Sequence, residues 1–82
     1  MRVDQYLRKT MIIKQREIAK KLCDKGYIRL NGHNVKPSKH VSVGDLIEIE
    51  TMNEHRKYRV VSIPVGNVKK KEHILYWEEV KD

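Results

Sequence analysis

The sequence has a single cysteine and no long apolar run, and both shortages limit where the protein can act. With Cys23 alone, no internal disulfide can form, so nothing in the chain calls for an oxidising compartment. No stretch approaches the roughly 18 apolar residues of a transmembrane helix, and the opening residues lack the apolar core of a signal peptide. We therefore expect a soluble, cytoplasmic protein without membrane contact.

The residues of a catalytic or metal site are also missing. No Ser, His and Asp arrangement for nucleophilic catalysis is present, and one cysteine cannot complete a zinc knuckle. Cys23 falls on an apolar stripe, where a buried and inert thiol is the ordinary outcome. The histidines are scattered singly, at His33, His40, His55 and His73. We predict no enzymatic activity, no metal and no cofactor.

Positive charge is abundant and unevenly distributed. The 82 residues hold 18 Lys and Arg against 11 Asp and Glu, a net charge of +7. The first 25 residues carry eight of these bases and three of the acids, whereas the remainder carries ten and eight. A small basic domain is the expected footprint for a phosphate backbone, because each neutralised phosphate releases a counterion. We therefore predict a nucleic-acid surface on the N-terminal third of one small domain.

That N-terminal third has the pattern of two helices. Asp4 is a good N-cap for a first short helix, whose apolar residues are Tyr6, Leu7 and Met11. A second helix is predicted over residues 14–25 and ends at Gly26 in a left-handed conformation. Its apolar stripe consists of Ile18, Ala19, Leu22 and Cys23.

From residue 27 the apolar period changes to two, as in strands. Residues 27–30 and 33–36 form a predicted hairpin around Asn31-Gly32, the strongest short turn signal. Further strands are predicted at 46–50 and 58–63, joined by a loop at 52–57. Residues 73–80 fit either a strand or a helical turn. The turn residues Gly26, Asn31, Gly32 and Gly44 are interpreted as architectural.

An ordered set of short motifs over about residues 1–50 resembles a known family. The set is Arg2-Val3-Asp4 with Leu7, Arg16 and Ala19 with Leu22, Gly26, Ile28, Leu30-Asn31-Gly32, Val35-Lys36-Pro37-Ser38, Val41 and Gly44-Asp45. It resembles the RNA-binding domain named after ribosomal protein S-four, the alpha-L motif. The resemblance implies an α+β fold with N-terminal helices packed on a small, mostly antiparallel sheet. We expect a single domain over 1–82, with C-terminal strands and a short tail in 51–82.

Among stand-alone members of this family, the chain resembles the RqcP-like and heat-shock-protein-fifteen-like groups. Its short length and brief basic tail favour the RqcP-like group. That resemblance implies association with the large ribosomal subunit and peptidyl-tRNA, in quality control of stalled chains that receive C-terminal alanine tails. The implied partners are ribosomal RNA, tRNA and a tailing factor on the stalled subunit, and we expect a monomer.

Candidate RNA-binding residues come from the basic helices and from the motif positions. RNA duplexes are recognised mainly by shape, phosphates and 2′-hydroxyls, and Arg offers a bidentate fork to phosphate oxygens. Asp4 is interpreted either as a plain N-cap or as a group that orients Arg2. For each lysine the alternative is a solvated side chain. The predicted set is Arg2, Asp4, Arg8, Lys9, Lys14, Arg16, Lys20 and Lys36.

Other interpretations stay open at this level. The apolar cluster at 74–77 is either an exposed platform or, with Trp77, a cover for a thin core. The basic run at 69–71 is either a second RNA contact or a solvated loop. The competing functions are a general binder of structured RNA or DNA, and a protein-interaction adaptor whose basic face meets an acidic protein.

Overall fold

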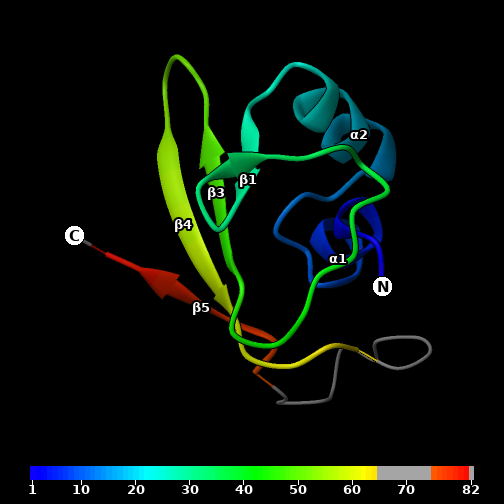
Figure 1. Cartoon of the computed structure of the whole chain (residues 1–82), viewed down its shortest axis with the longest axis vertical. Coiled ribbons are helices and arrows are strands. Elements are labelled where there is room, and N and C mark those ends of the chain that lie inside the picture. The colour runs from blue at the N-terminus through cyan, green and yellow to red at the C-terminus, as the bar shows by residue number, and fades with distance from the viewer. Residues whose placement is uncertain (65–74, 82) are drawn as a thin grey trace.

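Two helices pack against one side of a five-stranded antiparallel sheet (Figure 1). The computed structural model describes residues 1–64 and 75–81. The helices are α1 (Val3–Lys9) and α2 (Arg16–Asp24). The sheet order is β2-β1-β3-β4-β5. The strands are β1 (Ile28–Leu30), β2 (His33–Asn34), β3 (Leu46–Glu50), β4 (His55–Val60) and β5 (Trp77–Val80). This arrangement confirms the predicted α+β fold, and no described helix is long and apolar enough to cross a membrane.

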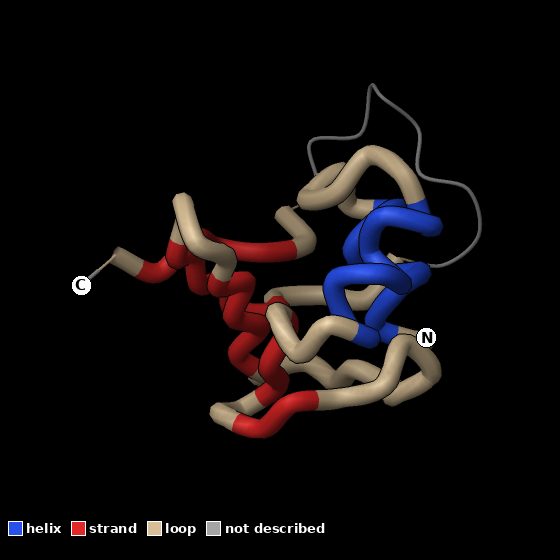
Figure 2. Tube along the Cα trace, turned by 90° about the horizontal axis from the view of Figure 1, so that it is seen from above, coloured by secondary structure: helices blue, strands red, loops and turns tan. Residues whose placement is uncertain are grey.

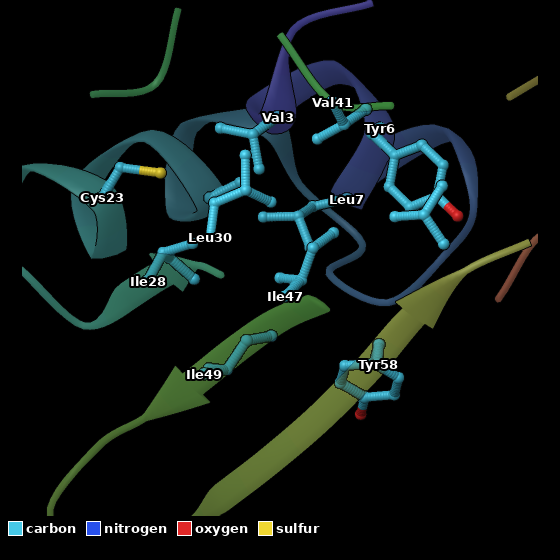
Figure 3. Packing of buried hydrophobic residues seen from close by; sticks show 12 residues of the cluster. Val3, Tyr6, Leu7, Cys23, Ile28, Leu30, Val41, Ile47, Ile49 and Tyr58 are labelled. Carbon is cyan, nitrogen blue, oxygen red and sulfur yellow. The ribbon is translucent and has the colours of Figure 1, made fainter. Parts of the chain in front are cut away.

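The core lies between the helices and the sheet. Alternate residues of β1, β3 and β4 point to the helical side, because successive side chains of a strand face opposite ways. Figure 3 shows these side chains converging with those of the helices, Leu7 lying near Ile47. The buried residues are Val3, Tyr6, Leu7, Ala19, Cys23, Ile28, Leu30, Val41, Ile47, Ile49, Tyr58 and Val60. The helical elements are thereby fixed on the sheet by a single small core.

The prediction that Asp4 caps the first helix is wrong. The N-cap is Arg2, and Asp4 lies inside the helix with its side chain fully buried. Arg2 is held extended because it forms a β-bridge with His40, and the Val3 N–H donates to the Lys39 carbonyl at 2.7 Å. A distant loop therefore sets where α1 begins.

The first helix also ends earlier than Met11. Its last residue is Lys9, the C-cap is Thr10, and Met11 has φ +64° with 62% of its surface exposed. The Thr10 hydroxyl donates to the Tyr6 carbonyl at 2.6 Å, and the Ile13 N–H closes the turn on Leu7 at 3.0 Å. Met11 therefore reverses the chain and does not belong to an apolar helix face.

Helix α2 is shorter than predicted, because it starts at Arg16 and not at residue 14. Gly26 follows it with φ +78°, which confirms the left-handed stop. Ala19 and Cys23 are buried, but Ile18 is 45% exposed, which corrects its assignment to the apolar stripe. Adjacent helical residues lie about 100° apart around the axis, so Ile18 falls outside the face centred on Ala19. Burial, with the nearby Asp4 and Asp24 carboxylates adding to it, raises the pKa of the Cys23 thiol to about 11.

Four strands differ from their predicted bounds. Strand β1 begins at Ile28 and not at residue 27, and β4 ends at Val60 and not at residue 63. The Asn31-Gly32 turn is confirmed, with φ values of +53° and +85°, but β2 spans only two residues and not 33–36. Strand β4 covers 55–60, where a loop to residue 57 was predicted, because the Thr51 N–H closes a tight turn on the Glu54 carbonyl at 2.8 Å. Residues 77–80 form a strand, while 73 and 74 lie outside the described residues.

Candidate nucleic-acid interface

A buried carboxylate joins two guanidinium groups from separate elements. The Arg2 Nη2 lies 3.1 Å from Asp4 Oδ2, and the Arg16 Nε lies 3.4 Å from the same oxygen. The carboxylate is fully buried, whereas the arginine side chains are 34% and 45% exposed. We call Arg2, Asp4 and Arg16 the Asp4 cluster. It carries two positive charges against one negative charge, and both arginine side chains are partly exposed.

The other oxygen of Asp4 is fixed from the backbone. The Gln5 N–H donates to Asp4 Oδ1 at 2.8 Å, and the Gln5 Oε1 accepts from the Arg2 N–H at 3.3 Å. These bonds hold the carboxylate at the first turn of α1, so Asp4 keeps both arginines in place. The plain N-cap interpretation of Asp4 is therefore excluded by geometry, and the contact with Arg2 is the one that an orienting role requires.

A small hollow lies beside the cluster, between α1 and the start of α2. Its volume is about 110 Å³, and its lining residues are Gln5, Arg8, Lys9 and Arg16. Three of these four side chains are cations. Arg16 is the first residue of α2, where free backbone N–H groups also favour an anion. We call this the anion hollow, because its size and charge suit a phosphate group.

The structure brings together five of the eight predicted RNA-binding residues. Arg2, Asp4 and Arg16 touch one another, and Arg8 and Lys9 share the anion hollow with Arg16. Of the other three, Lys14 is exposed in the turn between the helices and Lys20 is exposed on α2. Lys36 lines a different groove beside the hairpin.

Sequence reasoning missed Gln5 and the contact between Asp4 and Arg16. Gln5 could have been found, because a Gln at the third helical position often bonds back to the N-cap. The contact of Asp4 with Arg16 joins residues twelve apart across a chain reversal, and no sequence spacing signals it. The polar residues around Lys36 were missed as well.

The opposite face of the sheet has a different electrostatic character. Arg29 Nη1 lies 3.0 Å from Glu50 Oε2, and His55 Nε2 lies 3.1 Å from Glu48 Oε2. Arg59 stands opposite Glu78 in the register of β4 and β5. We call this the outer sheet face; its Arg, Lys and Glu residues are Arg29, Lys57, Arg59, Glu48, Glu50 and Glu78. With three bases and three acids, it offers no net attraction to a phosphate backbone.

Trp77 connects β5 to the end of α1. Its Nε1 donates to the Thr10 carbonyl at 3.1 Å, and its ring packs edge-on against Tyr58 at 4.9 Å between centroids. Trp77 is half-buried against the core, which favours its interpretation as a core cover over an exposed platform. Residues 69–71 lie outside the described residues, so the basic run is not placed.

Comparison with known proteins gives consistent matches. A family profile described as the S4 domain matches residues 1–47, more than half of the chain. The chain is 36% identical over 77 residues to an RQC P-site tRNA stabilizing factor of Helicobacter pylori, covering 93% of this chain and 92% of that protein. It is 39% identical over 49 residues to the factor of the same name in Bacillus subtilis, covering 60% and 57% of the two chains.

Two solved structures share the fold. One is the solution structure of a hypothetical protein, with a TM-score of 0.81, 32% identity and coverage of 100% of this chain and 99% of the other. The second is heat shock protein 15 of Vibrio cholerae, described as trimeric, with a TM-score of 0.84 and 24% identity. The match covers 98% of this chain and 81% of the Vibrio cholerae chain, and an identity of 24% supports a shared fold alone.

Proposed function

This chain belongs to the S4 domain family and is homologous to the RQC P-site tRNA stabilizing factors; on that premise we propose that it binds structured RNA on the large ribosomal subunit together with P-site tRNA. The process served is the quality control of stalled nascent chains that receive C-terminal alanine tails. The family is non-enzymatic.

The observation that carries the proposal is the Asp4 cluster beside the anion hollow. Arg2 and Arg16 are held at 3.1 Å and 3.4 Å from one buried carboxylate, which limits their motion before RNA arrives. Side chains that are already ordered lose less conformational entropy on binding. Charge-assisted bonds from Arg to phosphate are among the stronger hydrogen bonds in proteins. The cluster is therefore suited to hold the backbone of an RNA duplex.

Each predicted residue has a proposed role. Arg2 and Arg16 contact phosphates, and Asp4 positions both without touching RNA, because its side chain is fully buried. Arg8 and Lys9 extend the contact along α1 into the anion hollow. Lys14, Lys20 and Lys36 flank this surface and add long-range attraction.

The names of the relatives suggest tRNA as a partner, and the family resemblance implies the others. The proposed partners are ribosomal RNA of the large subunit, tRNA, and a tailing factor bound to the same stalled particle. We propose that the protein acts in the cytoplasm, where these particles are, and that it acts as a monomer. The Vibrio cholerae protein is described as trimeric. Measuring the mass of this protein in solution, with and without RNA, therefore tests whether it is a monomer.

Co-sedimentation with ribosomal particles from a lysate tests the function. The tagged protein is expected to migrate with free large subunits that carry tRNA, and Arg16→Ala is expected to remove it from that fraction. Arg59→Ala, on the outer sheet face, is the matched control and should migrate like the unchanged protein. Migration with no ribosomal particle would contradict the proposal. Competition among structured RNA, duplex DNA and an acidic protein then identifies a general nucleic-acid binder or an adaptor.

A further inference from the structure

A second and larger hollow lies on the hairpin side of the molecule. Its volume is about 540 Å³, and we call it the hairpin groove. We propose that the hairpin groove binds one unpaired nucleotide of the RNA partner, which rests on the proposed function in taking that partner to be RNA. Its lining residues are Leu30, Asn31, His33, Asn34, Val35, Lys36, Ser38 and Lys39.

The size and floor of the groove suit a nucleotide. Sites for small molecules commonly have volumes of about 300 to 1,000 Å³. The apolar lining comes from Leu30, which is buried, and Val35, which is half-buried. His33 stands opposite Leu30 in the register of the hairpin. Unpaired RNA bases are commonly stacked on aromatic side chains, histidine included, so the imidazole and the apolar floor can receive the faces of one base.

The polar side chains of the groove fall into two groups. Asn31 is occupied: its Nδ2 donates to Asp45 Oδ1 at 3.1 Å, and its Oδ1 accepts from the Leu46 N–H at 2.9 Å. The side chains of the other polar residues make no hydrogen bond or ion pair with any residue in 1–64 or 75–81. These residues are His33, Asn34, Lys36, Ser38 and Lys39. One wall of the groove is therefore fixed, while its remaining polar groups are available to a ligand.

The chemistry of these available groups matches the parts of a nucleotide. The Ser38 hydroxyl can both donate and accept, as the edge of a base requires. Lys36 and Lys39 supply charge for its phosphate, and no acidic residue lines the groove. An acidic peptide could pair with the two lysines, but its carboxylates offer no aromatic face for the imidazole and the apolar floor. A nucleotide offers a base for the imidazole and the floor, an edge for the hydroxyl and a phosphate for the lysines.

The groove is connected to the Asp4 cluster through the backbone. The chain leaves β2 and runs beside the start of α1 (Figures 1 and 2), where the Lys39 carbonyl accepts from the Val3 N–H at 2.7 Å and the Pro37 carbonyl accepts from the Asp4 N–H at 3.3 Å. The groove therefore borders the surface proposed to hold the duplex. One strand of that duplex can place an extruded nucleotide in it.

The test compares three RNA hairpins that differ at one position, by fluorescence anisotropy with the full chain. The first is fully paired, the second carries one extruded adenosine, and the third carries an abasic residue at the same bulge. We expect the adenosine bulge to bind about tenfold more tightly than the paired hairpin, since stacking one base contributes that order of affinity. The abasic bulge should lose most of this gain, because the phosphates remain and the base does not.

Two variants locate the effect. His33→Ala removes the imidazole proposed to stack on the base and should bring the affinity ratio of bulged to paired RNA to about one, with little change for the paired hairpin. Arg16→Ala should weaken both RNAs by the same factor and leave the ratio unchanged. Because the abasic comparison uses the unchanged protein, it does not depend on how any variant folds.

The outcomes separate the two proposals. Tight and equal binding of all three hairpins would overturn the nucleotide site and leave the RNA-binding function standing. A bulge preference that persists in His33→Ala would also overturn it, because recognition would then lie elsewhere. If the protein binds none of the three hairpins but does bind an acidic peptide, both proposals are overturned.

Discussion

The helical side and the outer sheet face contain similar types of charged residue but arrange them differently. On the helical side, two arginines share the single buried carboxylate of Asp4, and further cations line the anion hollow. On the outer sheet face, basic and acidic residues are equal in number, with Arg29 paired to Glu50 at 3.0 Å. The number of cations therefore does not distinguish the two surfaces. The placement of the acids does.

The difference has a simple structural origin. Antiparallel strands set residues directly opposite one another, so alternating bases and acids neutralise each other across the sheet. Asp4 is instead buried under the helices, where it orders the arginines without cancelling both. The first arrangement produces a neutral surface, and the second produces an ordered cationic one.

The largest effect on this comparison is expected from matched arginine substitutions. Arg16→Ala should lower the affinity for structured RNA about 30-fold, since a charge-assisted hydrogen bond contributes about 2 kcal/mol. Arg59→Ala, which removes the same charge from the outer sheet face, should change it less than about twofold, because long-range attraction is screened by salt. Anisotropy titrations at one salt concentration measure both. Equal losses would mean that only net charge matters.

A substitution that raises the net charge sharpens the comparison further. Asp4→Asn removes a negative charge, so simple attraction would strengthen RNA binding. We expect about tenfold weaker binding instead, because Arg2 and Arg16 lose the group that positions them. Circular dichroism must show an intact fold at the assay temperature. Tighter binding by folded protein would contradict the positioning role of Asp4.

A smaller effect is expected at Trp77, which connects β5 to the end of α1. Trp77→Phe keeps an aromatic ring beside Tyr58 but removes the hydrogen bond to the Thr10 carbonyl. The free energy of unfolding should fall by about 1 kcal/mol, the usual contribution of one such bond. Urea unfolding followed by circular dichroism measures it. An unchanged midpoint would mean that water replaces the indole at that carbonyl.

Local features of the fold were predictable, and features set by distant partners were not. The Asn31-Gly32 turn and the stop at Gly26 follow from positive φ angles that these residues adopt at little cost. The prediction for the start of α1 is wrong because Arg2 is paired with His40, which lies far along the chain. The assignment of Ile18 to the apolar stripe is wrong because the sequence of so short a helix does not show which residue lies at the centre of the buried face.

The candidate site shows the same division. Arg16 was identified by resemblance and by its basic helix, since both depend on residues close in sequence. The hairpin groove was not predicted because its lining residues come together only in the folded chain. Leu30 lies in β1, whereas Lys39 lies in the loop that follows β2. Charge patterning predicts the side of the molecule on which the cations gather, but not the hollows on it.

The central claim is that RNA meets the helical side and not the outer sheet face. Amide chemical shifts of the labelled protein, followed during titration with a structured RNA hairpin, test it most directly. We expect large shifts at Arg2, Arg8 and Arg16, and small ones at Glu48 and Arg59 on the outer sheet face. Shifts concentrated on β3 and β4, with the Asp4 cluster unchanged, would contradict it.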